Sequence, residues 1–304
     1  MATRIRQIAA LGLCLAGAAG AALAQPSDAE TLQPFLWQAK MAPSTIGEVN
    51  PFRRFSSERT EEMLRFYSEA LGFEPLPDAG GGALRMIRYP IGDSEIKLFP
   101  SQPSEPSTAG VRDAAGLRLF TFFFADEAEV AARFAAYGGE PPAFETLPDG
   151  RRAALVRDPD GEWIELVVVP GARPEELARF ETSIGASDLE ASRAFYRDVL
   201  GLEETGPVRD PHLGVDKYVY RHRSTTINVF AVGKDVPNAA ETGGIQYIVW
   251  NVEGVSDVAA RIGAQITRPL SPTGAMRSVW LADPDGVANY FAQFSGQDNT
   301  PPRQ

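Results

Sequence analysis

Two widely separated segments of the chain share one order of apolar and polar positions. Residues 61–73 read EEMLRFYSEALGF and residues 190–202 read EASRAFYRDVLGL. In the second segment apolar residues recur three and four positions apart, which predicts a helix with one buried face that ends at Gly201. Ser187 and Glu190 have the spacing of a capping box at its start. The match predicts the same helix in the first segment.

Strand-like apolar runs surround both helices, and each half of the chain then repeats the order of strand, helix and strands. The expected strands are 52–56, 83–89, 96–99, 117–124, 152–157 and 163–169 in the first half, and 180–186, 217–221, 226–232, 244–252, 279–282 and 288–294 in the second. The further expected helices are 127–137 and 255–262.

A second landmark closes each half. Asp158-Pro159-Asp160-Gly161 precedes EWIELVVV, and Asp283-Pro284-Asp285-Gly286 precedes VANYFAQF, at nearly the spacing that separates the two helical segments. Two independent landmarks at one offset indicate duplicated domains. The alternative is one large sandwich in which the matches are fortuitous. The predicted organisation is a signal peptide 1–24, a leader 25–47, domains 48–170 and 176–295, and a flexible tail 296–304.

The N-terminal segment has the pattern of a cleaved export signal. Arg4 and Arg6 precede an apolar run that ends in Ala22-Leu23-Ala24. We therefore expect a soluble protein secreted to a periplasm or to the exterior. The single cysteine, Cys14, lies within this signal, so the mature chain would hold no disulfide and no thiolate ligand. Lipidation at Cys14 is the less favoured alternative, because Leu13 precedes it where a small residue is needed.

Charge narrows the range of partners. The chain has a net charge of −11, which disfavours nucleic acid as a ligand. No segment after the signal is long and apolar enough to predict a membrane span.

The segments SDLEASRAFYRDVLGLEE and LVRDPDGEWIELVVV resemble the vicinal oxygen chelate superfamily, which includes glyoxalase I, extradiol ring-cleaving dioxygenases and bleomycin-resistance proteins. The resemblance covers roughly residues 48–295. It implies an α+β fold of tandem domains, with four βαβββ modules that form incomplete barrels around clefts. It also implies a small-molecule ligand and modules that pair within one chain or between chains of a homo-oligomer. In metal-using members, His and Glu side chains hold a divalent ion that chelates two substrate oxygens.

Carrying the family's ligand positions onto this chain leaves few metal ligands. In the order of the family pattern these positions are Phe52, Lys97, Leu119 and Glu165 in the first domain, and Glu181, Asn228, Tyr247 and Tyr290 in the second. The only histidines, His212 and His222, lie away from these positions. A divalent ion normally needs three or more suitable ligands, so the resemblance predicts no metal and no other cofactor.

Other interactions would then replace the metal. In the first domain we expect Lys97 to pair with Glu165, its ammonium taking the place of the cation. In the second domain Glu181, Asn228, Tyr247 and Tyr290 would form a hydrogen-bonding pocket, with Glu181 as a candidate general base. These assignments depend on strand register, because a shift of one residue turns each side chain to the opposite face.

Three functions remain open. The first is a metal-independent binder of a small oxygen-rich or aromatic molecule. The second is an enzyme, a glyoxalase-type lyase or ring-cleaving dioxygenase whose divalent metal uses Glu165 or Glu181 with unconventional partners. The third is an interaction protein with degenerate clefts.

Overall fold

The structure is a computed structural model that describes residues 45–77, 85–222, 224–249, 251–272 and 274–295. The predicted signal peptide with Cys14, nearly all of the predicted leader, and the predicted tail lie outside the described residues.

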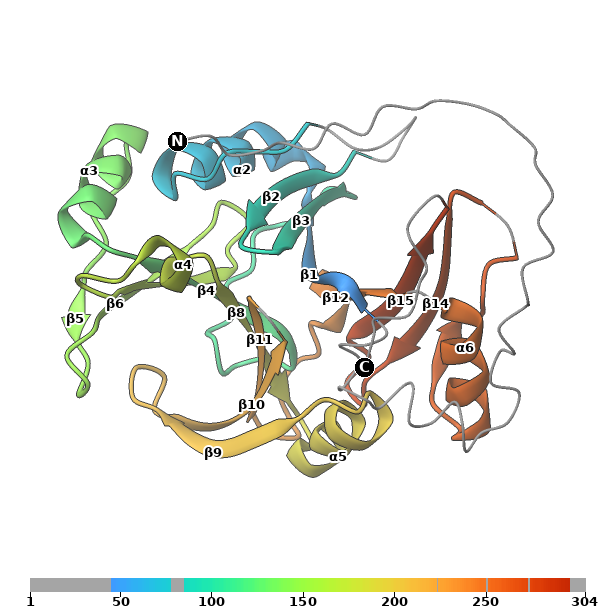
Figure 1. The fold of residues 1–304 in the computed structure, drawn as a ribbon. Helices are drawn as coiled ribbons and strands as arrows, with labels where there is room; N and C mark the ends of the chain where they lie inside the picture. The colour runs from blue at the N-terminus through green and yellow to red at the C-terminus, as the bar shows by residue number, and fades with distance from the viewer. Residues whose placement is uncertain (1–44, 78–84, 223, 250, 273, 296–304) are drawn as a thin grey trace.

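Four modules of a strand, a helix and further strands follow one another along the chain (Figure 1). Module 1 holds β1 (Thr45–Ser56), α2 (Thr60–Arg65), β2 (Ile87–Ile91) and β3 (Ser94–Ser101). Module 2 holds β4 (Gly116–Phe124), α3 (Glu127–Tyr137), β5 (Glu145–Thr146), β6 (Arg152–Arg157) and β7 (Trp163–Val168). After α4 (Pro174–Leu177), module 3 holds β8 (Phe180–Ala186), α5 (Leu189–Ala194), β9 (Glu204–Asp210), β10 (Val215–His222) and β11 (Thr225–Ala231). Module 4 holds β12 (Gly243–Val249), α6 (Val252–Arg261), β13 (Ile266–Arg268), β14 (Met276–Ala282) and β15 (Ala288–Phe294).

The two repeated helical segments form as expected and end in a wider turn. Helix α2 continues into a π-helical turn at Phe66–Ala70, and α5 continues into one at Phe195–Val199. Both Phe-Tyr pairs are buried, so they are core residues. The cap of α5 differs by one residue from the predicted Ser187, because the Asp188 side chain accepts a hydrogen bond from the Ala191 amide at 3.2 Å.

The strands form two sheets, and each sheet takes one module from each half of the chain. Sheet I has seven strands in the order β13-β14-β15-β12-β1-β3-β2, and sheet II has eight in the order β5-β6-β7-β4-β8-β11-β10-β9. Antiparallel pairing of β1 with β12 joins module 1 to module 4, and pairing of β4 with β8 joins module 2 to module 3. Each sheet ends in edge strands, so neither is a closed barrel.

The hydrophobic cores divide differently from the sheets. One core packs module 1 against module 2 through residues such as Met63, Phe66 and Phe134. The other packs module 3 against module 4 through Tyr196, Val255 and Phe291. Each half of the sequence therefore has its own core, as expected of tandem domains, while the hollow face of each sheet is shared between the halves.

The predicted fold class of four βαβββ modules in incomplete barrels is confirmed. Within the described part of the chain, no helix combines the length and the apolar character that a membrane crossing requires.

Candidate functional site

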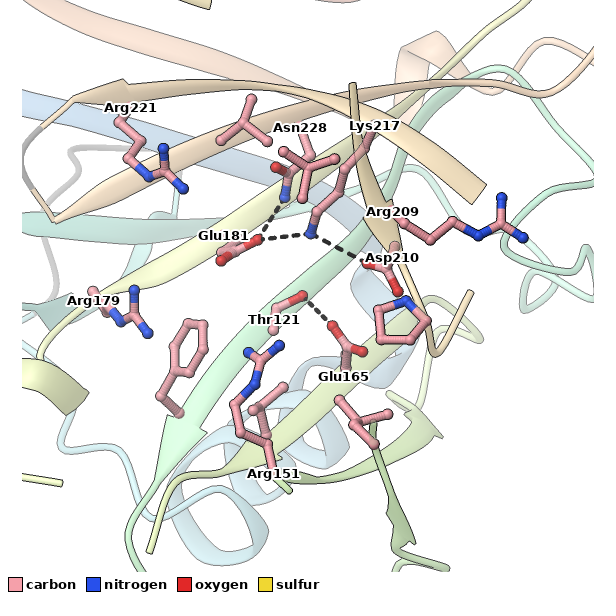
Figure 2. Close-up of a pocket in the computed structure, with 16 residues that line it drawn as sticks. Thr121, Arg151, Glu165, Arg179, Glu181, Arg209, Asp210, Lys217, Arg221 and Asn228 are labelled. Carbon is pink, nitrogen blue, oxygen red and sulfur yellow. Dashed lines mark hydrogen bonds and ion pairs between the residues drawn. The ribbon is translucent and has the colours of Figure 1, made fainter. Parts of the chain in front are cut away.

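The hollow of sheet II holds a pocket of about 210 Å³ whose polar side chains come from both halves of the chain (Figure 2). The structure therefore places the candidate site between module 2 and module 3 and not inside one predicted domain. Its charged and polar lining residues are Thr121, Arg151, Glu165, Arg179, Glu181, Arg209, Asp210, Lys217, Arg221 and Asn228.

The carboxylates of Glu165 and Glu181 lie at the centre of the pocket. The strands that carry them, β7 and β8, both pair with β4, which lies between them. Thr121 on β4 is in register with Glu165 on β7 and with Glu181 on β8. The Thr121 hydroxyl donates a hydrogen bond to Glu165 Oε2 at 2.8 Å. Glu165 and Glu181 are thus brought together across the module junction, as residues of one site.

Lys217 on β10 supplies the central positive charge. Its Nζ lies 3.2 Å from Glu181 Oε2 and 3.2 Å from Asp210 Oδ2. Burial by itself would lower the pKa of Lys217, but the attraction of Glu181 and Asp210 outweighs it and raises this pKa. The ammonium is therefore held in its charged form between the two carboxylates, as Figure 2 shows.

Asn228 on β11 completes the polar floor. Its Nδ2 donates to Glu181 Oε2 at 2.6 Å, while its Oδ1 is buried and has no hydrogen-bond partner. A buried acceptor without a donor costs free energy, so Asn228 Oδ1 is a place where a ligand hydroxyl or amine would be stabilised.

His212, in the turn between β9 and β10, lies beside Glu165. Its Nδ1 is 2.6 Å from Glu165 Oε1, and its Nε2 is 3.4 Å from Glu145 Oε1. The hydrogen bond to Glu165 raises the pKa of His212. The expectation that both histidines lie away from the ligand positions is thus wrong for His212, because the β9–β10 hairpin folds back over the pocket.

The hollow of sheet I differs because aromatic rings fill it. Phe52 packs edge-on against Phe99 and Tyr290, with ring centroids 5.9 and 5.7 Å apart. Trp280 stacks on Tyr290 at 4.2 Å. Phe52, the first ligand position of the family pattern in module 1, is therefore part of an aromatic cluster. We call Phe52, Tyr290 and Trp280 the aromatic plug.

The predicted ion pair between Lys97 and Glu165 is wrong. Lys97 lies on β3 in sheet I, where its Nζ donates to Gln246 Oε1 and lies 3.6 Å from Glu95 Oε2. Glu165 lies on β7 in sheet II and bonds to Thr121 and His212. The error arose because the prediction paired the modules within one domain, whereas the sheets pair them across domains.

The predicted set of four pocket residues is divided in the same way. Glu181 and Asn228 line the sheet II pocket, whereas Tyr247 and Tyr290 belong to sheet I. Tyr247 also faces the helix side of its sheet, where it stacks on Phe291 with centroids 4.8 Å apart. Strand alternation places Gln246, and not Tyr247, on the hollow face. In sheet II, Leu119 lies on the same face of β4 as Thr121 but one pair further along the strand, where it packs beside Trp163, so Thr121 and not Leu119 lines the pocket.

The sequence did not predict several of the charged pocket residues, namely Lys217, Asp210 and the four arginines that line the pocket. Lys217 and Asp210 lie on strands that the family pattern does not mark, and their facing depends on the register of β9 and β10. The available signal was the alternation in VDKYVYRH, which places Lys217, Val219 and Arg221 on one face of β10.

The donor set does not fit a divalent metal held by the family's pattern. Across the described residues, no group of three or more His, Cys, Asp and Glu side chains is arranged to hold a metal ion. Glu181 is bonded to an ammonium and an amide, and the 2.6 Å separation of His212 and Glu165 is that of a hydrogen bond. Two ligands of one metal at about 2.1 Å would stand further apart. The absence of a metal nevertheless stays a prediction, as does the role of Glu181 as a general base.

Comparison with known proteins agrees with this architecture. The model of the Glyoxalase/Bleomycin resistance protein/Dioxygenase superfamily matches residues 54–166 and again residues 178–291. No curated protein sequence matches the chain significantly.

Solved structures share the fold at low identity. A mutant form of glyoxalase I from Zea mays matches with a TM-score of 0.65 and 17% identity, covering 88% of this chain and 97% of that one. A putative dioxygenase from Bacillus subtilis matches with a TM-score of 0.58 and 13% identity, covering 83% and 86%. At these identities the likeness concerns the fold alone. Together with the two family matches, it shows that the chain belongs to the glyoxalase, bleomycin resistance protein and dioxygenase superfamily, the vicinal oxygen chelate proteins.

Proposed function

We propose that the sheet II pocket binds a small, oxygen-rich anion without a resident metal ion. The observation that supports this most directly is the charge of the pocket. Lys217 and four arginines line it, against the carboxylates of Glu165, Glu181 and Asp210. In a chain whose net charge is −11, the two pocket arginines that no carboxylate neutralises among the described residues favour an anionic guest.

Two of the arginines have no carboxylate partner among the described residues. Arg179 donates through Nε to the Glu176 carbonyl at 3.0 Å and lies over Phe123 at 4.2 Å. Arg221 is exposed, and Figure 2 shows it at the same edge of the pocket as Arg179. Arg151 and Arg209, by contrast, are paired with Asp149 and Asp216. Arg179 and Arg221 are therefore the groups we expect to bind the ligand's carboxylate.

The floor of the pocket selects a second ligand feature. A ligand hydroxyl could donate to the unpartnered Asn228 Oδ1 and accept from Lys217 Nζ. A small hydroxy acid would use both sets of groups, its carboxylate bound by Arg179 and Arg221 and its hydroxyl by Asn228 and Lys217. Recognition rests on the protein's own charges, because Lys217 supplies the positive charge that a metal ion supplies elsewhere in the superfamily.

Calorimetric titration with malate, succinate and the neutral malamide tests this proposal. We expect malate to bind more tightly than both others, and Arg221→Ala and Asn228→Leu each to weaken malate about tenfold. Arg65→Ala is the matched control, because Arg65 is an exposed arginine on α2 remote from the pocket lining. Equal binding of malate and malamide would contradict the proposal. So would a stoichiometric divalent ion in purified protein that is lost in Glu165→Gln or Glu181→Gln, which would favour a metal-dependent enzyme.

We also propose that the protein is exported with its signal removed. The charged start, the apolar run and Ala22-Leu23-Ala24 support this. Expression of the full chain in a Gram-negative host should place it in the periplasmic fraction with Gln25 as its first residue, as read by N-terminal sequencing. Recovery of uncleaved chain in the cytoplasm would count against export.

A further inference from the structure

A second and larger hollow, of about 900 Å³, lies where sheet I meets module 2. We call it the sheet I groove. Its apolar wall includes Phe55, Ala114, Ala240, Trp280 and Ala288. Unlike the sheet II pocket, it therefore offers a broad apolar surface next to charged groups.

The charged groups at one end are two arginines held over aromatic rings. The guanidinium carbon of Arg268 lies 4.6 Å from the ring centroid of Trp280, and that of Arg54 lies 5.2 Å from the centroid of Phe52. Arg54 donates to the carbonyl oxygen of Glu241 at 2.9 Å. Neither guanidinium forms an ion pair with a carboxylate anywhere in the described ranges.

The two guanidinium groups also act on each other. Burial lowers the pKa of Arg54, and the positive charge of Arg268 lowers it further, by more than the Glu241 carboxylate raises it. Two like charges kept together in this way are unfavourable unless an anion lies between them. The aromatic plug holds both arginines in place, so an incoming anion meets a preformed site.

Two of the four acidic residues that line the groove, Asp160 and Glu162, lie at its other end in ion pairs. Arg59 lies 3.2 Å from Asp160, and Arg118 lies 3.6 Å from Glu162. Asp160 and Glu162 are thus engaged by other arginines, and the Glu241 carboxylate offsets the effect of Arg268 on Arg54 only in part, so Arg54 and Arg268 together attract an anion.

We propose that the sheet I groove is a second binding site, specific for amphiphilic carboxylates. The carboxylate would be bound by the paired forks of Arg54 and Arg268, and an aromatic or branched apolar body would pack against Ala288 and Ala240. Guanidinium groups match the planar geometry of a carboxylate, and the apolar wall stabilises a body that the polar sheet II pocket would exclude. This site is independent of the proposed function, since it shares no lining residue with the sheet II pocket.

The test is calorimetric titration of the full mature chain with 1-naphthoate, and with the neutral 1-naphthamide as the comparison ligand. We expect 1-naphthoate to bind at least tenfold more tightly than the amide. Arg268→Ala should weaken 1-naphthoate about tenfold or more, which is the usual effect of losing one charge-assisted hydrogen bond. Arg54→Lys should weaken it less than Arg54→Gln, because lysine keeps the charge but lacks the planar fork.

Arg173→Ala is the matched control, because Arg173 is an exposed arginine outside both sites. Arg268 is itself exposed, so its variant should fold, and a circular dichroism melt confirms that each variant is native. Equal affinity for the acid and the amide would overturn the proposal, as would an unchanged affinity in Arg268→Ala. Binding that is lost in Lys217→Met but kept in Arg268→Ala would overturn it too, because the ligand would then occupy the sheet II pocket. Failure of malate to bind, with 1-naphthoate binding intact, contradicts the proposed function alone.

Discussion

Replacing Arg53 by methionine is expected to reduce the free energy of unfolding by about 3 kcal/mol near neutral pH. Arg53 on β1 is fully buried, its Nη1 lies 3.3 Å from Asp158 Oδ2, and its guanidinium carbon lies 4.3 Å from the centroid of Phe120. The pair joins module 1 in sheet I to the turn that follows β6 in sheet II. Without the guanidinium, the Asp158 carboxylate would be buried near Glu162 with no cation beside it. Urea unfolding monitored by circular dichroism measures the change.

The destabilisation of the Arg53→Met variant should depend on pH, because Asp158 titrates. Burial raises the pKa of Asp158 to about 6, and Arg53 opposes that rise. A carboxyl group whose pKa is raised on folding contributes stability below its unfolded pKa of about 3.9, and that stability is lost as pH rises through the folded pKa. Loss of Arg53 should raise the pKa of Asp158 further. The Arg53→Met variant should therefore be more destabilised at about pH 8 than at about pH 5.

The sequence repeat supplies the matched control. Thr182 stands at the same distance before its Phe-Tyr pair as Arg53 does, and its buried hydroxyl has no hydrogen-bond partner. Thr182→Val should leave stability unchanged or raise it, because it removes an unpartnered buried hydroxyl, and the effect should not depend on pH. Asp283 is the residue of the second half that corresponds to Asp158, and its environment differs in the same way. No arginine among the described residues forms an ion pair with Asp283, and burial raises the pKa of Asp283 to about 7. A loss in Arg53→Met that is equal at both pH values would contradict the argument.

Local patterns predicted the modules well because each module depends on contacts close in sequence. The buried Phe-Tyr pairs and the Asp-Pro-Asp-Gly turns fix the helices and the closing hairpins, and they mark four units without any knowledge of tertiary contacts. Glu165, Glu181 and Asn228 line the sheet II pocket, and each stands at a fixed distance from one of these landmarks.

Which module joins which could not be derived in the same way. The junctions of β1 with β12 and of β4 with β8 are long-range antiparallel pairings between strands of similar composition. Either pairing of the modules would bury the same apolar faces, so periodicity cannot distinguish them. Lys97 and Glu165 were separated for this reason. The prediction for Tyr247 was wrong for a second reason. An error of one residue in strand register moves a predicted side chain to the opposite face of the sheet.

Neither the repeated motifs nor strand alternation could predict the position of His212. It lies in the turn between β9 and β10, and a turn's direction over a pocket is set by the twist of its strands. Composition alone could not have placed its ring beside Glu165.

Replacing Lys217 by methionine is expected to cost about 2 kcal/mol of stability at neutral pH and to abolish malate binding. The Lys217 ammonium lies between Glu181 and Asp210, whose side chains are 19% and 8% exposed. Removing the cation leaves two largely buried carboxylates facing each other. We place the cost below that of a fully buried pair, because water reaches Glu181 in part. The pKa of Lys217 is raised on folding, so the stability it contributes is fully present at neutral pH and is lost only when strongly alkaline solution deprotonates it.

Two further variants separate charge from packing in this experiment. Lys217→Arg keeps the positive charge and should retain most of the stability, whereas Lys217→Met keeps the aliphatic stem and loses the charge. Lys234→Met is the matched control, because Lys234 is 79% exposed and should contribute less than about 0.5 kcal/mol. Thermal unfolding and malate titration of the variants give the two readouts. If Lys217→Met is as stable as the wild type and still binds malate, then Lys217 does not replace the superfamily's metal ion, and the proposed mode of binding is wrong. If stability falls but malate affinity is unchanged, Lys217 stabilises module 3 through Glu181 and Asp210 and takes no part in recognition.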